Sequence, residues 1–208
     1  MSDTVAADAP NLKLESQWIA RARQGDQTAF SQLVTVYQKP VFNVCYRMLG
    51  NRADAEDAAQ EAFIRAYLKL DTYNTDRKFS SWLFSIASHH CIDRLRKQRM
   101  KLVSWDDLPP WNWIPAKKSE QPEAVMVENE NTRELHALLN TLPPDYRAAV
   151  VLKYWHEMSY DEIAESLDTT VSAIKSKLFR ARKMMAQAAK KKEAPSAAVG
   201  ITAPLTVL

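Results

Sequence analysis

Apolar residues recur every three or four positions along most of this chain, which is the spacing of one buried helix face. The first such stretch begins at Leu12, points Leu14, Trp18 and Ile19 inward, and ends near Gly25. A second stretch runs from 26 to 48 and keeps its spacing through Pro40, where we expect a kink or a join. With only three glycines and ten prolines in 208 residues, the pattern predicts an all-α fold.

Further helices are predicted at 52–70, 79–101, 132–142 and 145–156, followed by a pair of helices at 159–185. In that pair, Ser159 and Glu162 have the spacing of a capping box, in which each side chain accepts a backbone N–H of the other residue. One buried stripe is expected to follow, made of Tyr160, Ile163, Ala164 and Leu167. Asp168, Thr169 and Thr170 supply turn and N-cap chemistry before the second helix, so the region predicts a helix-turn-helix.

The second helix of this pair is strongly basic. Residues 169–192 contain eight lysines and arginines and no acidic residue. The expected outward side chains include Ser172, Lys175, Ser176, Phe179, Arg180 and Lys183. A basic amphipathic helix can be an ordinary solvated surface, but the preceding paired helix and the hydroxyl residues at its entering end favour DNA binding.

An acidic face distinguishes the helix at 52–70. Alanines dominate one side, whereas the other side carries Asp54, Glu56, Asp57, Gln60 and Glu61. Carboxylates in a first turn stabilise the helix dipole, which accounts for Asp54 and Glu56 but not for Glu61. Such a face suits docking on a basic partner surface.

A basic surface is predicted where the helix at 79–101 ends, because residues 94–101 hold five positive charges. Part of this charge serves the helix dipole. The preceding loop at 71–78 contains Tyr73 and Asn74, and aromatic side chains beside cations can bind single-stranded nucleic acid. The neighbouring His89 and His90 diverge by about 100° on a helix, so no metal site is expected there.

Residues 102–131 differ in composition: they are acidic, contain four prolines and include Trp105, Trp111 and Trp113. This composition predicts a linker between a domain at 12–101 and a domain at 132–190. The tryptophans are too many for a mere spacer and suggest that the linker packs on something. The ends, 1–11 and 191–208, are expected to be disordered.

Few residue patterns in the chain point to membrane insertion, catalysis, or cofactor or metal binding. The net charge is only +3, and the chain shows neither a secretory signal nor an apolar run that could span a membrane, so a cytoplasmic protein without membrane insertion is expected. Cys45 and Cys91 are expected to be buried thiols. The four histidines lack paired carboxylates or cysteines, and no glycine-rich phosphate loop is present, so we expect no enzyme, cofactor or metal.

With these residues in view, the chain from about 12 to 188 resembles a bacterial RNA polymerase sigma factor of the extracytoplasmic-function type. Residues 54–63 (DAEDAAQEAF) resemble the family's polymerase-binding helix, and residues 79–87 (FSSWLFSIA) resemble the helix after its promoter-melting loop. Residues 142–152 resemble the entry to its second domain, and 159–183 resemble its DNA-reading helix-turn-helix. The order of these four parts is more specific than any one of them.

The resemblance implies three sets of functional residues. Core RNA polymerase, through its clamp and flap regions, would be one partner, with the clamp bound by Asp54, Glu56, Asp57, Gln60, Glu61 and Phe63. Promoter DNA, duplex and single-stranded, would be the other partner, and its minus-ten element would be met by Tyr73, Asn74, Lys78, Trp82, Arg94 and Arg96. The minus-thirty-five element would be met by Ser172, Lys175, Ser176, Phe179, Arg180 and Lys183.

The family's linker passes near the RNA path, which would explain the three tryptophans, and an anti-sigma protein is a common partner. This linker is longer and more aromatic than the resemblance requires, and the family usually lacks the apolar-ended tail found here. The implied function is promoter recognition and melting for a stress-type regulon. A stand-alone helix-turn-helix regulator remains the alternative, and it would need no acidic helix and would bind DNA without polymerase.

Overall fold

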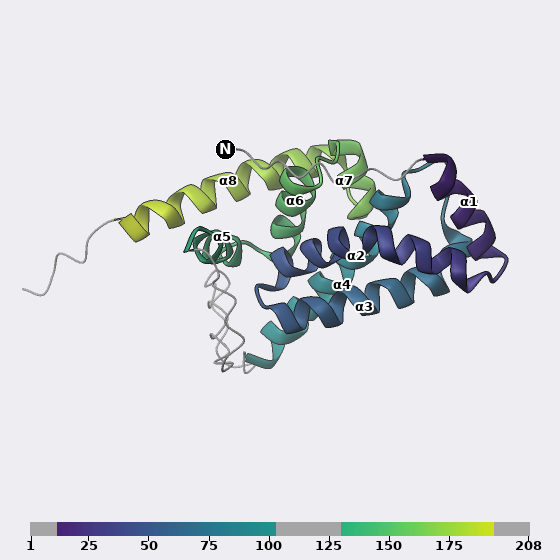
Figure 1. The fold of residues 1–208 in the computed structure, drawn as a ribbon. Helices are drawn as coiled ribbons and strands as arrows, with labels where there is room; N and C mark the ends of the chain where they lie inside the picture. Colours follow the sequence, from purple (N-terminus) through teal and green to yellow (C-terminus); the bar gives the residue numbers. More distant parts are fainter. Residues whose placement is uncertain (1–11, 103–129, 194–208) are drawn as a thin grey trace, which may run out of the picture.

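The computed structural model describes residues 12–102 and 130–193, and throughout these ranges the regular structure is helical (Figure 1). The helices are α1 (Leu12–Arg23), α2 (Gln27–Leu49), α3 (Arg52–Leu68), the 3-10 helix η1 (Leu70–Thr72), α4 (Phe79–Leu102), α5 (Glu130–Asn140), α6 (Pro144–Trp155), α7 (Tyr160–Ser166) and α8 (Val171–Glu193). The all-α prediction is confirmed. Residues 103–129 of the predicted linker and the ends at 1–11 and 194–208 lie outside the described residues; α4 includes Leu102, α5 already begins at Glu130, and α8 continues to Glu193.

Helices α1 to α4 form the first unit of the fold. Helix α2 starts where the Asp26 side chain accepts the Ala29 N–H, and it stops at Gly50, whose φ of 80° suits the left-handed cap. It passes through Pro40 as one helix, so of the kink or join expected at this residue, the join is wrong. The alanine face of α3 is buried as predicted, and these small side chains let α3 lie close to α2 and α4.

Helices α5 to α8 form the second unit. The capping box between Ser159 and Glu162 is present at the start of α7, as predicted. The Thr170 hydroxyl accepts the Ala173 N–H and so caps α8. Tyr160 does not join the buried stripe: it is 39% exposed, with the Lys153 ammonium 4.8 Å from its ring centre. Leu14 of α1, also expected inward, is 44% exposed.

The two units pack against each other instead of standing apart. Helices α6 and α7 lie on α2 and α4, and buried residues of both units belong to one hydrophobic cluster (Figure 1). Arg147 of α6 is 5% exposed and donates a hydrogen bond of 2.5 Å to the Met48 carbonyl near the end of α2. The Ser166 hydroxyl of α7 donates to the Ser81 carbonyl of α4 at 3.3 Å.

This contact between the units buries polar groups that are incompletely paired. The Arg47 guanidinium lies over the Trp155 ring at 4.9 Å, and the His156 ring lies 4.3 Å from that of Phe84. Within the described residues, one buried ring or guanidinium nitrogen of each of Arg47, Arg147 and His156 has no hydrogen-bond partner. Burial lowers the pKa of Arg147 to about 10 and, with the nearby Arg47 charge, lowers the pKa of His156 to about 4. The interface therefore carries a desolvation cost that opening would relieve.

Because the pKa of His156 is lower in the packed arrangement than the 6.5 of an exposed imidazole, packing is favoured above pH 6.5 and weakened as the pH falls towards 4. Lowering the pH from about 7.5 to about 5.5 should disfavour packing roughly tenfold through this group. Urea unfolding at the two pH values measures the effect. The loss of unfolding free energy between the two pH values is compared with the same loss in His156→Asn, which removes the titrating group. The variant should lose less; equal losses in the two proteins would contradict the prediction.

Candidate protein-docking and nucleic-acid surfaces

The acidic face predicted on α3 is formed, and its residues differ in exposure and in whether they form ion pairs. The Asp57 side chain is 70% exposed, and Gln60 is exposed beside it. Glu56 pairs with Arg52 at 2.8 Å and Glu61 pairs with Arg65 at 2.7 Å, both one turn apart on the surface. The bond from Arg65 lowers the pKa of Glu61, so this carboxylate stays charged at neutral pH. Phe63 is partly buried against the core.

Asp54 is the less exposed of two carboxylates on this face that pair with Arg94 of α4; the other, Asp57, is 70% exposed and lies 4.0 Å from the same guanidinium. The Asp54 carboxylate also accepts a hydrogen bond from the Asn51 side-chain amide. The Asp54 backbone N–H in turn donates to the Asn51 side-chain oxygen at 2.7 Å, which caps α3. The family resemblance implies that Asp54 meets polymerase and Arg94 the minus-ten element, but the structure makes them partners of each other. Their first role is to fasten α3 to α4.

Asp54→Ala should therefore lower the free energy of unfolding by about 1–2 kcal/mol, because it removes a half-buried ion pair and loosens the cap of α3. Asp57→Ala on the same face should change stability by less than about 0.5 kcal/mol, since its carboxylate is exposed. Thermal or urea unfolding of the two variants checks the contrast. Equal stability of both variants would show that the Asp54–Arg94 pair is not structural.

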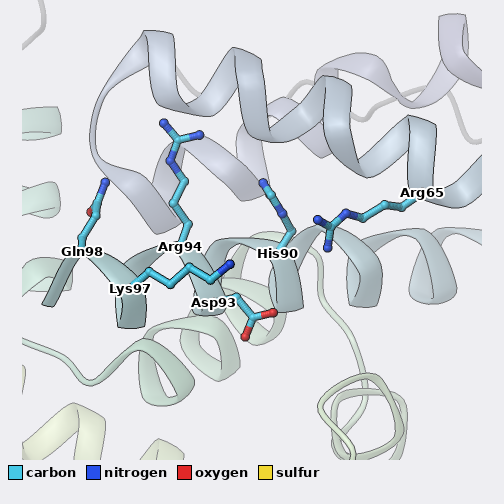
Figure 2. Close-up of a pocket in the computed structure, with 6 residues that line it drawn as sticks. All are labelled: Arg65, His90, Asp93, Arg94, Lys97 and Gln98. Atoms are coloured by element: carbon cyan, nitrogen blue, oxygen red, sulfur yellow. The ribbon is translucent and has the colours of Figure 1, made fainter. Parts of the chain in front are cut away.

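A basic hollow of about 430 Å³ lies between α3 and α4, lined by Arg65, His90, Asp93, Arg94, Lys97 and Gln98. Figure 2 shows that Arg65 enters it from one helix and the other five from α4. Burial and the Arg65 charge lower the pKa of His90, so its imidazole is neutral at pH 7. Two of its cations already have carboxylate partners, Arg65 with Glu61 and Arg94 with Asp54. Arg65 was not predicted for such a surface, because it belongs to a helix that was interpreted as acidic.

The loop before α4 is held together by Tyr73, which is only 5% exposed. Its ring packs against Phe79 and Trp82, and its hydroxyl donates to the Arg77 carbonyl. Arg23 of α1 donates to the Tyr73 carbonyl. Tyr73 therefore shapes the loop in this arrangement, where its ring is not open to a stacking base. Asn74, whose side chain accepts the Asp76 N–H, is exposed.

Two of the cations predicted to meet the minus-ten element face acids of the second unit. Lys78 pairs with Glu162 at 2.9 Å, and Arg96 pairs with Asp145 at 2.8 Å. Arg77, next to Lys78, pairs with Glu165 of α7. In each of these three pairs the base belongs to the first unit and the acid to the second. Arg96 and Asp145, for example, are 49 positions apart in the chain. Sequence spacing alone could not reveal such contacts.

Helix α8 presents its predicted DNA-reading residues at the surface. Lys175, Ser176, Arg180, Lys183 and Ser172 are exposed, and Phe179 is 64% exposed, although it is a large apolar side chain. The helix extends away from the rest of the molecule (Figure 1). Arg180 and Lys183 also border a hollow of about 310 Å³ beside Pro143 and Tyr146. The arrangement leaves a basic helix face free to enter a DNA groove.

Residues 12–102 and 130–193 contain no group of three or more histidine, cysteine or acidic side chains that could hold a metal ion. None of the helices in these ranges is both long and apolar enough to cross a membrane.

Comparison with known proteins gives a consistent result over both units. Residues 33–100 match the family model "Sigma-70 region 2", and residues 132–185 match "Sigma-70, region 4". The chain is 38% identical to the ECF RNA polymerase sigma factor SigW of Bacillus subtilis, over 80% of this chain and 92% of that protein. It is 32% identical to the ECF RNA polymerase sigma-E factor of Escherichia coli, over 79% of this chain and 88% of that protein.

Solved structures share the fold. CnrH in complex with the cytosolic domain of CnrY matches with a TM-score of 0.63 and 23% identity, over 86% of this chain and 98% of that chain. The sigma factor RpoE of Bartonella quintana, in complex with the anti-sigma factor NepR, matches with a TM-score of 0.58 and 21% identity, over 77% and 96%. The two region matches and the identity to SigW show that the chain belongs to the ECF sigma factors of RNA polymerase.

Proposed function

We propose that this protein binds core RNA polymerase, recognises the minus-thirty-five and minus-ten promoter elements, and promotes DNA melting at the start of transcription. The observation that carries the proposal is the presence of two separate surfaces in one chain. An acidic face on α3 suits a protein partner, and an exposed basic face on α8 suits DNA. The units that carry them match region 2 and region 4 of the sigma-70 family.

The division of labour follows the charges. Residues 12–101 form the domain for polymerase and the minus-ten element, and residues 132–190 form the domain for the minus-thirty-five element. Glu56, Asp57, Gln60 and Glu61 meet the polymerase clamp, because this part of the α3 face stays at the surface: the Asp57 carboxylate is 70% exposed although it lies 4.0 Å from Arg94, and Glu56 and Glu61 pair within α3. Lys175, Ser176, Phe179 and Arg180 face the bases, while Ser172 and Lys183 face phosphates.

Neither DNA-binding surface should bind tightly alone, because each offers few phosphate contacts. Docking on polymerase holds both at a fixed spacing, so two weak contacts act at high effective concentration. Melting then depends on trapping an extruded base near the loop at 73–78, which offsets an unstacking cost of a few kcal/mol. Tyr73 can take part only if this loop rearranges, since its ring is buried here.

The stand-alone regulator is the alternative that needs a direct test. A sigma factor protects promoter DNA only with core polymerase, whereas a stand-alone regulator protects its site without it. Footprinting of promoter DNA with the protein alone, with polymerase alone, and with both separates the two. We expect protection of both elements only with both components. Protection by the protein alone would favour the regulator. The enzyme alternative is answered by family membership, because sigma factors are non-enzymatic initiation factors.

Regulation and location follow from the same role. A protein that works with polymerase acts in the cytoplasm, and we propose a stress-type regulon for it. Sigma factors of this fold are known in complexes with anti-sigma proteins, as the RpoE and NepR pair shows. We propose such a partner here as well. Copurification of one small membrane-linked protein would support it, whereas a factor that is freely active in unstressed cells would count against it.

A further inference from the structure

We propose that Arg23, the last residue of α1, is a positioning residue for reading the minus-ten element, because it holds the loop at 71–78 in the conformation that presents Asn74. Helix α1 carries none of the predicted site residues and begins before the range 33–100 that matches region 2. The inference rests on the proposed function of this loop, and it adds a helix outside that range to promoter reading.

The Arg23 guanidinium joins two backbone carbonyls where the loop starts. Its Nε donates to the Leu70 carbonyl at 3.1 Å, and one of its terminal nitrogens donates to the Tyr73 carbonyl. Its Cζ lies 5.7 Å from the centre of the Tyr73 ring. Carbonyls at a helix end lack helical partners and are stabilised by a nearby cation. Leu70 begins η1 and Tyr73 is its C-cap, so one side chain of α1 holds both ends of this short helix.

The bond to the Tyr73 carbonyl sets the direction of the exposed residues that follow. A peptide unit is planar, so the Tyr73 carbonyl and the Asn74 N–H move as one rigid plane. Tyr73 is 5% exposed, whereas all residues from 74 to 78 are exposed. The Asn74 side-chain oxygen accepts the Asp76 N–H at 2.9 Å, which orients this side chain on the loop. By holding the plane, Arg23 fixes where Asn74 leaves the core.

Helix α1 also supports the far end of the loop, through Glu15. The Tyr37 hydroxyl of α2 donates to the buried Glu15 carboxylate at 2.5 Å. The Tyr37 ring packs edge-on against Phe79, the first residue of α4, with 5.4 Å between ring centres. The Phe79 ring in turn packs edge-on against Tyr73, again at 5.4 Å. The exposed part of the loop thus spans two buried rings that α1 helps to hold in place.

Arg21, in the same turn of α1, makes a different kind of contact. Its guanidinium pairs with Asp26 at 2.6 Å, at the cap of α2. Arg23 instead donates to loop carbonyls, and its planar guanidinium fixes both in one geometry, whereas the ammonium of a lysine is a point charge. Recognition of one base depends on such fixed geometry, because a displaced side chain loses the correct base. Contacts to phosphate depend on it less.

Three variants separate positioning from charge. Arg23→Ala removes both carbonyl bonds, and Arg23→Lys keeps the charge without the planar fork. Arg21→Ala is the matched control, because it removes a guanidinium from the same turn and leaves the bonds to Leu70 and Tyr73 in place. All three should bind core polymerase like the unsubstituted protein, since neither arginine belongs to α3. Circular dichroism checks the fold, and Arg23→Lys carries the test if Arg23→Ala loses helicity.

The first measurement is hydrogen exchange in the full chain without polymerase, followed by mass spectrometry on peptides that cover residues 70–78. Within this segment the Tyr73 N–H donates to the Leu70 carbonyl and the Arg77 N–H to the Asn74 carbonyl, both at 3.2 Å. Exchange should be about tenfold faster in Arg23→Ala than in Arg21→Ala, with Arg23→Lys between them, because the loop opens more often. Equal exchange in the three variants would overturn the proposal.

The second measurement is the preference of the polymerase-bound protein among fluorescent single strands. One strand carries the minus-ten element of a promoter mapped with polymerase, and the others replace each of its bases in turn. Arg23→Ala should reduce the preference at one base about tenfold, Arg23→Lys should reduce it less, and Arg21→Ala should keep it.

An unchanged preference in Arg23→Ala would overturn the positioning role. An equal loss of affinity on all strands would overturn it too, since that result indicates a general loss of charge or stability. An unsubstituted protein that prefers no strand would instead reject the proposed function, and hydrogen exchange would still decide whether Arg23 holds the loop.

Discussion

Reversing the charges of Asp57 and Glu61 together, with Asp57→Lys and Glu61→Lys, weakens binding to core polymerase by on the order of 100-fold, because two attractive contacts become repulsive. The effect is large since the Asp57 carboxylate is exposed and Glu61 stays charged at neutral pH. The fold should survive, because neither residue is buried in the core. Pull-down on core polymerase and a titration by fluorescence anisotropy measure the loss.

Asp71→Lys is the control, a reversal at an exposed carboxylate of η1 outside α3. It should bind polymerase like the unsubstituted protein, and circular dichroism should show native helicity for all variants. Normal polymerase binding by the double reversal would remove α3 from the docking surface. The structure makes Asp54 unsuitable for this test, because its loss would break a half-buried pair with Arg94, whereas the contact of Asp57 with the same guanidinium is 4.0 Å long and exposed.

Arg180→Ala should weaken recognition of the minus-thirty-five element by roughly 1–3 kcal/mol, about 5- to 150-fold, if its guanidinium reads a base edge in the major groove. The side chain is exposed on α8, which carries no acid between Val171 and Lys192. Its removal should cost little stability. Open-complex formation on a promoter and on single-base variants of its upstream element measures both affinity and specificity.

Lys183→Ala provides the comparison, since Lys183 is proposed to meet phosphate. It should weaken binding by a similar factor on every promoter and make binding less dependent on salt. Arg180→Ala should instead flatten the preference at one base pair. A uniform loss for Arg180→Ala across all promoter variants would assign it to phosphate as well.

Local patterns predicted the helices well because their signals lie within one turn or two. The capping box at Ser159 and Glu162 and the alanine face of α3 are confirmed in the structure. The errors have local causes too. Tyr160 fits a buried spacing, yet its ring supports the Lys153 and Lys175 ammonium groups at the surface.

The relation between the units could not be predicted, because it depends on pairs far apart in the chain. Nothing near Arg147 in the sequence indicates that its guanidinium reaches the carbonyl of Met48, 99 positions away. The same holds for Asp54 and Arg94, which were assigned to different surfaces and lie 40 positions apart. Charge on a helix face predicts a binding surface. Only the packed structure shows which of these charged side chains already form ion pairs within the protein.

Run-off transcription with purified core polymerase on a library of genomic fragments tests the central claim most directly. We predict transcripts that require the added protein, start at defined positions, and share two upstream elements at a fixed spacing. Asp57→Lys with Glu61→Lys should abolish them. Transcripts identical with and without the protein, or none with it, would contradict the assignment to promoter-directed initiation.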